Sequence, residues 1–531
     1  MPTIVSCFFI LLLSFLNVAT ANAGALDESI ELLSSRDFSD KSKGIEILSN
    51  SGHAQAEKLL NAILDSRLYF VKKGQRLVIV QLEGNKFQLF DALSGEDFGL
   101  VSKRKVKKIS INNKLRKQIK TQLKLYKLNH ADASVRLAAV ESLLGIAEPA
   151  AFKILSDRKN IETDADVITA IDALIAFGTL QSGSVEAKLA AIEQLQNYLN
   201  PTVLVELKKI SASADDNKVR AAAKKAVSRL EAKVTAFGHL ETLFFGLSLG
   251  SILALAAIGL AITFGVMGVI NMAHGELIMI GAYTTYVIQL LMPNHIEASI
   301  LVAIPAAFLV SGLVGVFIER FVIRFLYGRP LETLLATFGI SLFLQQAIRS
   351  IFSPLNRSVI TPEWMSGSLQ INSLLSITYN RLYIFLFCLI IFALLYLLMK
   401  NSSLGLQVRA ISQNRPMARA MGIRSQRVDA MTFGLGSGIA GVAGVALSQI
   451  TNVGPNLGQA YIVDSFMVVV FGGVGNLWGT LISGLTLGVV GKYLEPVTGA
   501  VLAKILVLIF IILFINKRPR GLFPQRGRAA E

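Results

Sequence analysis

Residues 265–282 read GVMGVINMAHGELIMIGA, and residues 471–479 read FGGVGNLWG. Each segment interrupts a strongly apolar stretch with glycines and an asparagine, so an uninterrupted membrane-spanning helix is not expected there. Interrupted helices in both halves of a membrane domain are typical of transport proteins, in which the broken backbone faces a polar solute near the bilayer midplane. The two segments therefore predict a transport pathway. The glycines expected to form the breaks are Gly268, Gly275, Gly472, Gly473, Gly475 and Gly479.

The composition favours a membrane domain joined to at least one domain outside the bilayer. The chain has 531 residues, 53% of them hydrophobic, and a mean hydropathy of +0.55, which is too long and too apolar for one soluble domain. A net charge of +16 would suggest nucleic acid as the partner of a soluble protein. In a membrane protein, Lys and Arg gather instead on cytoplasmic loops and beside anionic lipid. We expect the lipid bilayer as a partner and no nucleic acid.

The N-terminus has the pattern of a secretory signal peptide, predicted over residues 1–23. An apolar core runs from Ile4 to Leu16, and the small-residue pattern Ala21-Asn22-Ala23 follows it. The region ahead of the core lacks Lys and Arg, which leaves a retained anchor as the alternative. Cleavage near Gly24 would place the next domain in the periplasm.

Residues 24–240 are polar and are predicted to form this periplasmic domain. A β-rich part is expected at about 68–111, followed at about 131–235 by short helices that repeat roughly and resemble a small HEAT-like solenoid. An ordinary helical bundle is the alternative. The basic stretch between Lys103 and Lys127 is interpreted as a solvated face rather than a nucleic-acid site, because a translocated domain meets no nucleic acid.

Residues 241–516 are predicted to form a polytopic helical permease domain of about eight spans, two of them broken by glycine. The fold class is thus mainly α, with a helical periplasmic domain that has a small β-rich part. The expected apolar segments are 243–273, 275–292, 299–319, 332–352, 382–399, 429–450, the broken pair 461–475 and 477–491, and 499–516.

Charge predicts the orientation of this domain. The loop 400–428 contains six basic residues and no acid, and the tail 517–531 is also basic, whereas loops 293–298 and 451–460 are nearly neutral. The excess of Lys and Arg on cytoplasmic loops places both basic segments inside. Counting spans back from them places residue 241 outside, in agreement with a translocated N-terminal domain. We expect a multi-pass protein of the cell inner (plasma) membrane with a cytoplasmic C-terminus.

The cytoplasmic loop contains a predicted short amphipathic helix, Arg415–Met421, which Gly422 could end in a left-handed conformation. Small alanines would allow close docking, and the arginines would meet an acidic partner or lipid. A coupling helix seated on an ATPase subunit and a plain basic loop are equally compatible with this pattern. The residues expected to couple to an ATPase are Arg415, Ala418, Arg419, Ala420, Gly422 and Ile423.

The chain shows no pattern of an enzyme. It lacks the phosphate-binding G-x-x-x-x-G-K-[S/T] motif, so ATP hydrolysis is expected in separate subunits. No His/Cys/Asp/Glu cluster has metal-ligand spacing, and no catalytic residue, metal or cofactor is predicted.

Three motifs resemble the branched-chain amino-acid permease family of ABC importers. They are the run Gly246–Ser251 continued by 268–276, the segment 409–423, and Gly472–Asn476 with Gly479. The resemblance covers residues 243 to about 520. Within that family, a signal peptide and a long helical domain ahead of the permease resemble the urea-importer branch. In the wider ABC-importer coupling pattern an acidic residue precedes two alanines, whereas this chain reads Met417-Ala418-Arg419.

The resemblance implies a permease that moves urea or another small polar solute. Its implied partners are a periplasmic substrate-binding protein, a paralogous permease subunit and two ATP-binding subunits. Polar side chains at the breaks would pass the solute along, although His274 and Glu276 could instead only cap a helix end. The pathway residues implied are Asn271, His274 and Glu276 at the first break, Asn476 at the second, and Asp464 near the outer face.

Three other functions are considered. A branched-chain amino-acid ABC permease with an accessory domain would have a pocket for an apolar side chain among its spans. A secondary transporter or channel would need no ATPase, and the basic loop argues against it. A membrane-anchored scaffold is disfavoured because an anchor needs no breaks.

Overall fold

The structure is a computed structural model that describes residues 28–35, 37–50, 55–71, 76–83, 86–145, 149–372 and 374–524. The predicted signal peptide and the end of the predicted basic tail lie outside these ranges. The chain divides into two compact units, Met1–Ala232 and Lys233–Glu531. The division falls within one long helix, α10 (Asn217–Met267), a few residues before the boundary predicted at residue 240.

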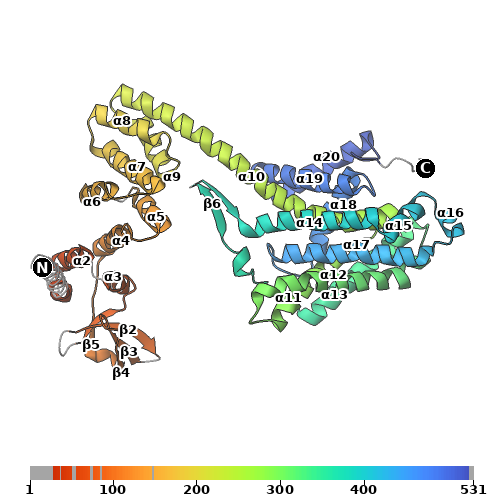
Figure 1. Cartoon of the computed structure of the whole chain (residues 1–531), viewed down its shortest axis with the longest axis horizontal. Coiled ribbons are helices and arrows are strands. Elements are labelled where there is room, and N and C mark those ends of the chain that lie inside the picture. The colour runs from red at the N-terminus through yellow and green to blue at the C-terminus, as the bar shows by residue number, and fades with distance from the viewer. Residues whose placement is uncertain are drawn as a thin grey trace, which may run out of the picture. The chain divides into compact units, whose positions relative to one another are not determined.

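The first unit contains an antiparallel five-stranded sheet, ordered β4-β3-β2-β1-β5, in the part predicted to be β-rich (Figure 1). Buried side chains come from both faces of this sheet: Val78, Val80 and Leu89 belong to one cluster, whereas Leu77 and Phe70 belong to another. The strands are β1 (Leu68–Val71), β2 (Leu77–Glu83), β3 (Lys86–Asp91), β4 (Asp97–Val101) and β5 (Val106–Lys108), with the short helix η1 (Lys103–Lys105) before β5.

Polar side chains cap the starts of three helices of this unit. Asp132, Asp164 and Ser184 each accept a hydrogen bond from a backbone N–H in the first turn that follows, which satisfies a donor the helix leaves free. The helices are α2 (Phe38–Asn50), α3 (Ala56–Leu64), α4 (Asn113–Lys127), α5 (Ala133–Leu143), α6 (Pro149–Lys159), α7 (Ala165–Ser182), α8 (Val185–Leu195) and α9 (Pro201–Ser213).

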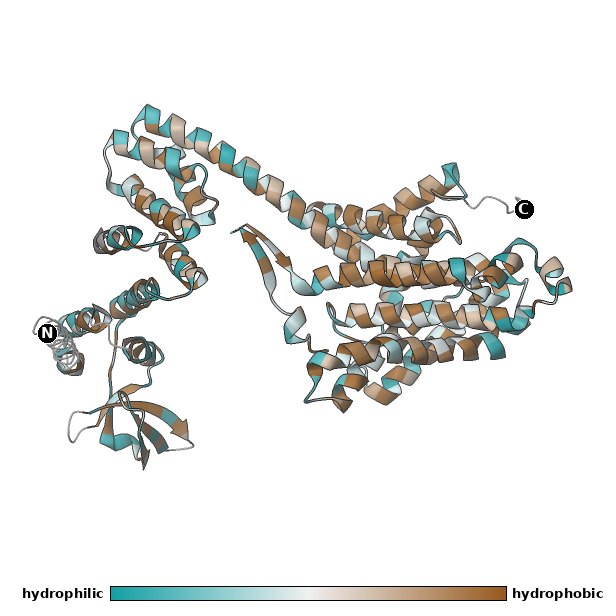
Figure 2. Ribbon diagram, viewed as in Figure 1, coloured by the Kyte–Doolittle hydropathy of each residue, from teal (hydrophilic) through white to brown (hydrophobic). Residues whose placement is uncertain are grey.

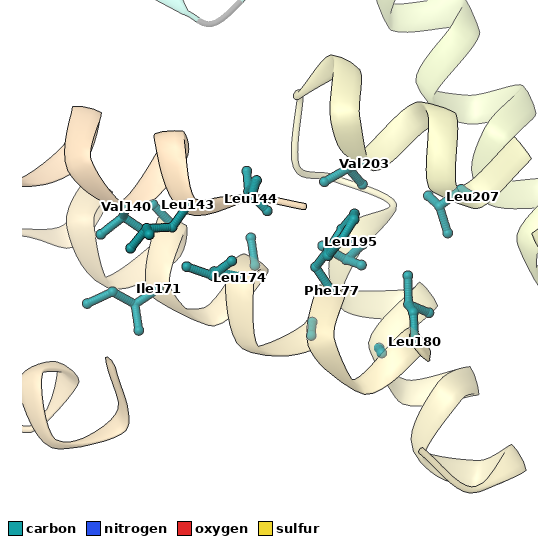
Figure 3. Close-up of a cluster of buried hydrophobic side chains, with 14 of the residues drawn as sticks. Val140, Leu143, Leu144, Ile171, Leu174, Phe177, Leu180, Leu195, Val203 and Leu207 are labelled. Atoms are coloured by element: carbon teal, nitrogen blue, oxygen red, sulfur yellow. The ribbon is translucent and has the colours of Figure 1, made fainter. Parts of the chain in front are cut away.

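A single hydrophobic cluster joins these repeated helices (Figure 3). Val140 of α5, Leu174 and Phe177 of α7, Leu195 of α8 and Leu207 of α9 are all buried in it. Helix α7 is long and apolar enough to cross a membrane by composition, but its apolar side chains pack inside the unit. A shared core of this kind fits both the predicted solenoid and the alternative helical bundle.

The second unit is built of long apolar helices that match the predicted spans (Figures 1 and 2). Seven of its described helices are long and apolar enough to cross a membrane. Helices α11 and α18 match the two remaining predicted spans. The mainly helical fold class is confirmed. The helices after α10 are α11 (His274–Leu291), α12 (Ile296–Phe321), α13 (Pro330–Phe352), α14 (Tyr379–Asn401), α17 (Ser425–Ser448), α18 (Leu457–Gly472), α19 (Leu477–Thr498) and α20 (Ala500–Lys517).

Shorter elements lie between the spans. The loop between α13 and α14 contains a hairpin that the sequence did not predict, β6 (Ser368–Asn372) paired with β7 (Leu375–Thr378). The predicted cytoplasmic loop forms two helices, α15 (Ser403–Gln413) and α16 (Arg415–Ala420). Short 3-10 turns occur at Ile323–Phe325 and Glu363–Met365.

Close contact through glycine holds the central helices of this unit together. A Cβ placed on Gly441 of α17 would lie 2.5 Å from the Ala307 carbonyl oxygen of α12, and one on Gly275 of α11 would lie 2.5 Å from the Gly458 carbonyl oxygen of α18. Small residues let the backbones of membrane helices approach closely. Helices α11, α12, α17 and α18 therefore form a tightly packed body around the first break.

Candidate functional site

The first break separates α10 from α11. Helix α10 ends at Met267, and Gly268 follows with φ +66°, a conformation that favours glycine. Asn271 is fully buried, and its Oδ1 accepts a hydrogen bond of 3.0 Å from the Ala273 backbone N–H. The Met272 N–H donates to Thr337 Oγ1 of α13 at 3.1 Å. The turn thus satisfies its backbone partly through side chains, as an irregular segment among apolar helices must.

His274 and Glu276 form the start of α11, and both are buried. His274 Nε2 lies 2.8 Å from the Ala256 carbonyl oxygen of α10. Glu276 Oε1 accepts hydrogen bonds from Ser341 Oγ at 2.9 Å and from Gln345 Nε2 at 2.8 Å, both on α13. Neither side chain caps α11, so the alternative role as a helix cap is not seen.

The partners of this break form a polar row on α13 that the sequence reasoning missed. Thr333, Thr337, Ser341 and Gln345 are all buried and are spaced by four, which places them on one face of the helix. The signal was available, because polar residues at a spacing of four within an otherwise apolar span mark a face that avoids lipid.

Three polar atoms at the first break are left without a hydrogen bond among the residues that the structure describes. They are Asn271 Nδ2, His274 Nδ1 and Glu276 Oε2, and each is buried. Buried polar atoms in proteins are nearly always paired, so three unpaired atoms within six residues need an explanation. Together they offer an N–H donor, a ring nitrogen and a carboxylate oxygen, a set suited to a solute that both donates and accepts hydrogen bonds.

The second break joins α18 to α19. Gly473 and Gly475 have φ of +102° and +81°. Asn476 caps α19, with Oδ1 accepting from the Gly479 N–H at 3.1 Å, and its Nδ2 donates to the Phe523 carbonyl oxygen at 3.2 Å. Because residue 523 follows the end of α20, this break lies at the end of the bundle and not half-way along the spans. The midplane location inferred from the sequence is not what the structure shows for this break.

A cavity of about 450 Å³ lies where the two broken helices meet. A Cβ on Gly265, near the end of α10, would lie 2.5 Å from the Cα of Gly475. The cavity is lined by residues from both, together with the basic end of α14 and α15; Asn476, Lys400, Arg409 and Trp478 are among them. Asn271, His274 and Glu276 do not line it, so the structure brings together the two breaks but not all the predicted pathway side chains.

Asp464 lies apart from both breaks. Its Oδ2 accepts a 2.9 Å hydrogen bond from Lys504 Nζ of α20. It lines a second cavity of about 270 Å³, which also contains the ion pair between Lys492 and Glu495. The partner found for Asp464 satisfies its charge without a solute.

The predicted coupling helix is present as α16, and Gly422 follows it with φ +87°. Ala418 is buried, whereas Ala420 is exposed and Ile423 half-buried. The arginines bind within the chain: Arg415 Nη2 donates to Asp429 Oδ1 at 2.7 Å, and Arg419 Nε donates to Ser425 Oγ at 2.8 Å. Arg419 remains exposed, as do Met417 and Met421, at 60% and 77%.

Within the described ranges, no group of three or more His, Cys, Asp or Glu side chains could hold a metal ion. The arrangement at the breaks can bind by hydrogen bonds, and it presents no activated nucleophile or acid–base pair facing a cavity.

Comparisons with known proteins show which family the second unit resembles. A family model described as "Branched-chain amino acid transport system / permease component" matches residues 242–515. The branched-chain amino acid transport permease BraD of Pseudomonas aeruginosa is 31% identical over 54% of this chain and 96% of its own length. The corresponding LivH of Escherichia coli K12 is 32% identical over 53% of this chain and 94% of its own. The ribose import permease RbsC of that strain is 24% identical over 53% of this chain and 88% of its own.

No solved structure matches the chain. The matched proteins are permeases of transport systems, so this protein is a transport subunit and not an enzyme. The family model spans just over half of the sequence and includes both breaks and the segment that contains α16. The chain belongs to the branched-chain amino acid permease family of ABC transport systems.

Proposed function

We propose that the chain is the membrane-spanning permease subunit of an ATP-driven importer, and that the first break forms part of the path of its solute. The observation that carries this proposal is the set of three unpaired buried polar atoms of Asn271, His274 and Glu276. Polar groups within membrane spans are costly and usually face a pathway or a partner. A passing solute would supply their missing hydrogen bonds.

A branched-chain amino acid is the first candidate solute. The relatives BraD and LivH are named as branched-chain amino acid permeases, and each is matched over nearly its whole length. Such a solute has an ammonium group that could donate a hydrogen bond to Glu276 Oε2. Its side chain would suit the apolar spans.

Urea is the second candidate, and the first unit favours it. The relatives are covered to 94–96% by little more than half of this chain, and the family model begins only at residue 242. A long helical domain ahead of the permease is the feature that resembles the urea-importer branch. Urea is neutral and both donates and accepts hydrogen bonds, as the unpaired atoms at the break do.

The proposed partners are a periplasmic binding protein, a paralogous permease and two ATP-binding subunits. Helix α16 is the proposed contact with an ATP-binding subunit, through the exposed Met417 and Met421. Methionine side chains are flexible and adapt to an apolar groove. The arginines of α16 are held by α17 and its first turn, so they are not the principal contact that we expect.

The first unit is proposed to lie in the periplasm. Loop 400–428 is basic, and the excess of Lys and Arg on cytoplasmic loops would place α16 inside. Nine helices between α10 and α20 match predicted spans. The chain would then enter the first of them from the periplasmic side and leave the last on the cytoplasmic side.

Uptake of labelled leucine and labelled urea tests the proposal. Cells would make this chain with its neighbouring transporter subunits, and a parallel strain would carry Met417→Glu, which adds a charge to the proposed contact. The control is Gln413→Glu, which adds the same charge at the exposed end of α15. We expect uptake of one of the two solutes, lost in Met417→Glu and retained in Gln413→Glu.

Leucine uptake would assign the amino-acid function, and urea uptake would assign the urea function. Uptake that is insensitive to Met417→Glu and to depletion of ATP would refute an ATP-coupled importer.

A further inference from the structure

A buried group of charged and polar side chains lies at the basic end of the second unit. It consists of Glu319 of α12, Tyr327 of the following turn, Arg415 of α16 and Asp429 of α17; we call it the 319–429 cluster. Arg415 Nη2 donates to Asp429 Oδ1 at 2.7 Å, and its guanidinium lies 4.7 Å from the centre of the Tyr327 ring. The Tyr327 hydroxyl donates to Glu319 Oε1 at 3.3 Å. The cluster thus connects four separate segments of the chain.

The chemistry of the 319–429 cluster is not explained by stability alone. Both carboxylates are only 1% exposed, and burying ions costs free energy that their pairing often fails to return. Apolar residues of similar size would hold the same helices together at least as well. An arginine that pairs with a carboxylate and stacks on an aromatic ring is held at a defined distance and orientation from both groups. The cluster therefore fixes where α16 lies relative to α12 and α17.

Helix α16 is held on one side and free on the other. Ala418 packs in a small apolar core with Val408, Ile411 and Val428, and Arg419 bonds to Ser425 at the start of α17. Met417 and Met421 point outward. A force applied to the exposed side would reach the rest of the unit through the side that is held.

Behind the cluster, α12 and α17 lead to the first break. The two helices touch where Gly441 meets Ala307. Helix α17 also touches α10 and α11 through glycine, since a Cβ on Gly436 would lie 2.6 Å from the Gly259 carbonyl oxygen and one on Gly444 would overlap the Ile278 carbonyl. Close-packed interiors pass on displacement because they cannot absorb it. Movement of α12 and α17 would therefore reach α11, which carries His274 and Glu276.

We propose that the 319–429 cluster is the connection through which displacement of α16 moves α12 and α17 and thereby alters the first break. Arg415, Asp429, Tyr327 and Glu319 are positioning residues: they couple ATP hydrolysis to transport without contacting the solute. This inference rests on the proposed function, in which an ATP-binding subunit seats on α16.

The test uses the complete transporter in proteoliposomes, with its binding protein. Uptake of labelled leucine and of labelled urea is measured together with phosphate release, which gives the amount of solute imported per ATP hydrolysed. The variants are Asp429→Asn, Tyr327→Phe, and the charge swap Arg415→Asp with Asp429→Arg. The control is Arg427→Gln, which removes one positive charge from an exposed neighbouring position that makes no ion pair in the described part of the chain.

We expect Asp429→Asn to lower the amount imported per ATP by about tenfold, a typical size for coupling between two sites, while the complex stays assembled. Tyr327→Phe should cause a smaller reduction, because it keeps the ion pair and the aromatic ring and removes only the hydroxyl group, which contacts Glu319 and Asp429. The charge swap restores an ion pair between positions 415 and 429, so it should recover most of the import per ATP that Asp429→Asn loses. A variant that only damages the fold would show no such recovery. Arg427→Gln should leave the ratio unchanged.

An assembled Asp429→Asn complex with the wild-type ratio would overturn the inference. If that variant does not assemble with the ATP-binding subunits, Tyr327→Phe decides: a lowered ratio supports the connection and an unchanged ratio rejects it. Wild-type vesicles that import neither solute with ATP would instead reject the proposed function, a result distinct from the failure of any variant.

Discussion

The carboxylate of Glu276 is the acceptor for two side chains of α13, Ser341 and Gln345. We predict that Glu276→Leu lowers the free energy of unfolding by about 2 kcal/mol, because it leaves two buried donors without an acceptor. Glu276→Gln keeps a carbonyl oxygen in reach and should cost less than half of that. Denaturant unfolding of the detergent-solubilised protein measures both. Equal losses in the two variants would show that the hydrogen bonds at this carboxylate do not contribute.

A second residue-scale prediction concerns Glu162 in the first unit. Arg136 binds both oxygens of this buried carboxylate, at 2.8 and 2.7 Å, and lowers the pKa of Glu162 from 4.5 to about 2. Because the pKa is lower in the folded state, the stabilisation is complete above about pH 4.5 and is lost as the pH falls toward 2. Glu162→Gln should cost about 3 kcal/mol at neutral pH, the typical loss when a buried ion pair is broken.

Hydrogen exchange of α5 and α7 in the full-length protein measures this loss. The protection factors, which are exchange rates corrected for the intrinsic rate at each pH, should fall in the wild type between pH 4.5 and 2, and their difference from Glu162→Gln should shrink over the same range. The control Glu186→Gln changes an exposed carboxylate of α8 that has no ion pair in the described ranges and should have no such effect. A difference between wild type and Glu162→Gln that does not depend on pH would contradict the assignment.

At the scale of elements, glycine contacts hold α17 against its neighbours. We predict that Gly441→Ala destabilises the second unit by about 2 kcal/mol, a usual cost of overpacking, because the new methyl group would meet the Ala307 carbonyl oxygen at 2.5 Å. The matched control is Gly339→Ala on α13, where an added Cβ meets nothing within 4 Å. Thermal unfolding in detergent should show a lower midpoint only for Gly441→Ala. Similar midpoints for both would mean that α12 and α17 can separate without cost.

At the scale of the whole molecule, the proposed orientation predicts which unit reacts from outside. The sequence has only two cysteines; Cys388 is buried, and Cys7 lies in the predicted signal peptide. We expect Ala221→Cys, at an exposed site of the first unit, to react with a membrane-impermeant maleimide in intact spheroplasts. Gln426→Cys, at an exposed site beside α16, should react only after permeabilisation. The reverse pattern would place the first unit in the cytoplasm.

The elements of this protein could be predicted from the sequence because their signals are local. Apolar runs define the spans, Asp132 and Asp164 start helices through bonds to the next turn, and Gly422 ends the segment of α16 with a positive φ. Each of these effects depends on residues within a few positions. The strands of the hairpin β6–β7 do alternate between polar and apolar residues, but they are only five and four residues long, and such short runs are a weak signal within a loop.

The candidate site could be predicted only in part, for a physical reason. The breaks at residues 268 and 473 follow from glycine in the sequence, but the partners of the polar side chains do not. Glu276 meets Gln345, 69 positions away, and Lys504 lies 40 positions from Asp464. Arg415 turns inward to Asp429 rather than outward to a partner.

The sequence by itself determined the spans and where they are interrupted, because hydropathy and backbone freedom are properties of each residue. Only the tertiary structure decided which buried polar groups are paired, because pairing depends on helices that the chain brings together from distant positions.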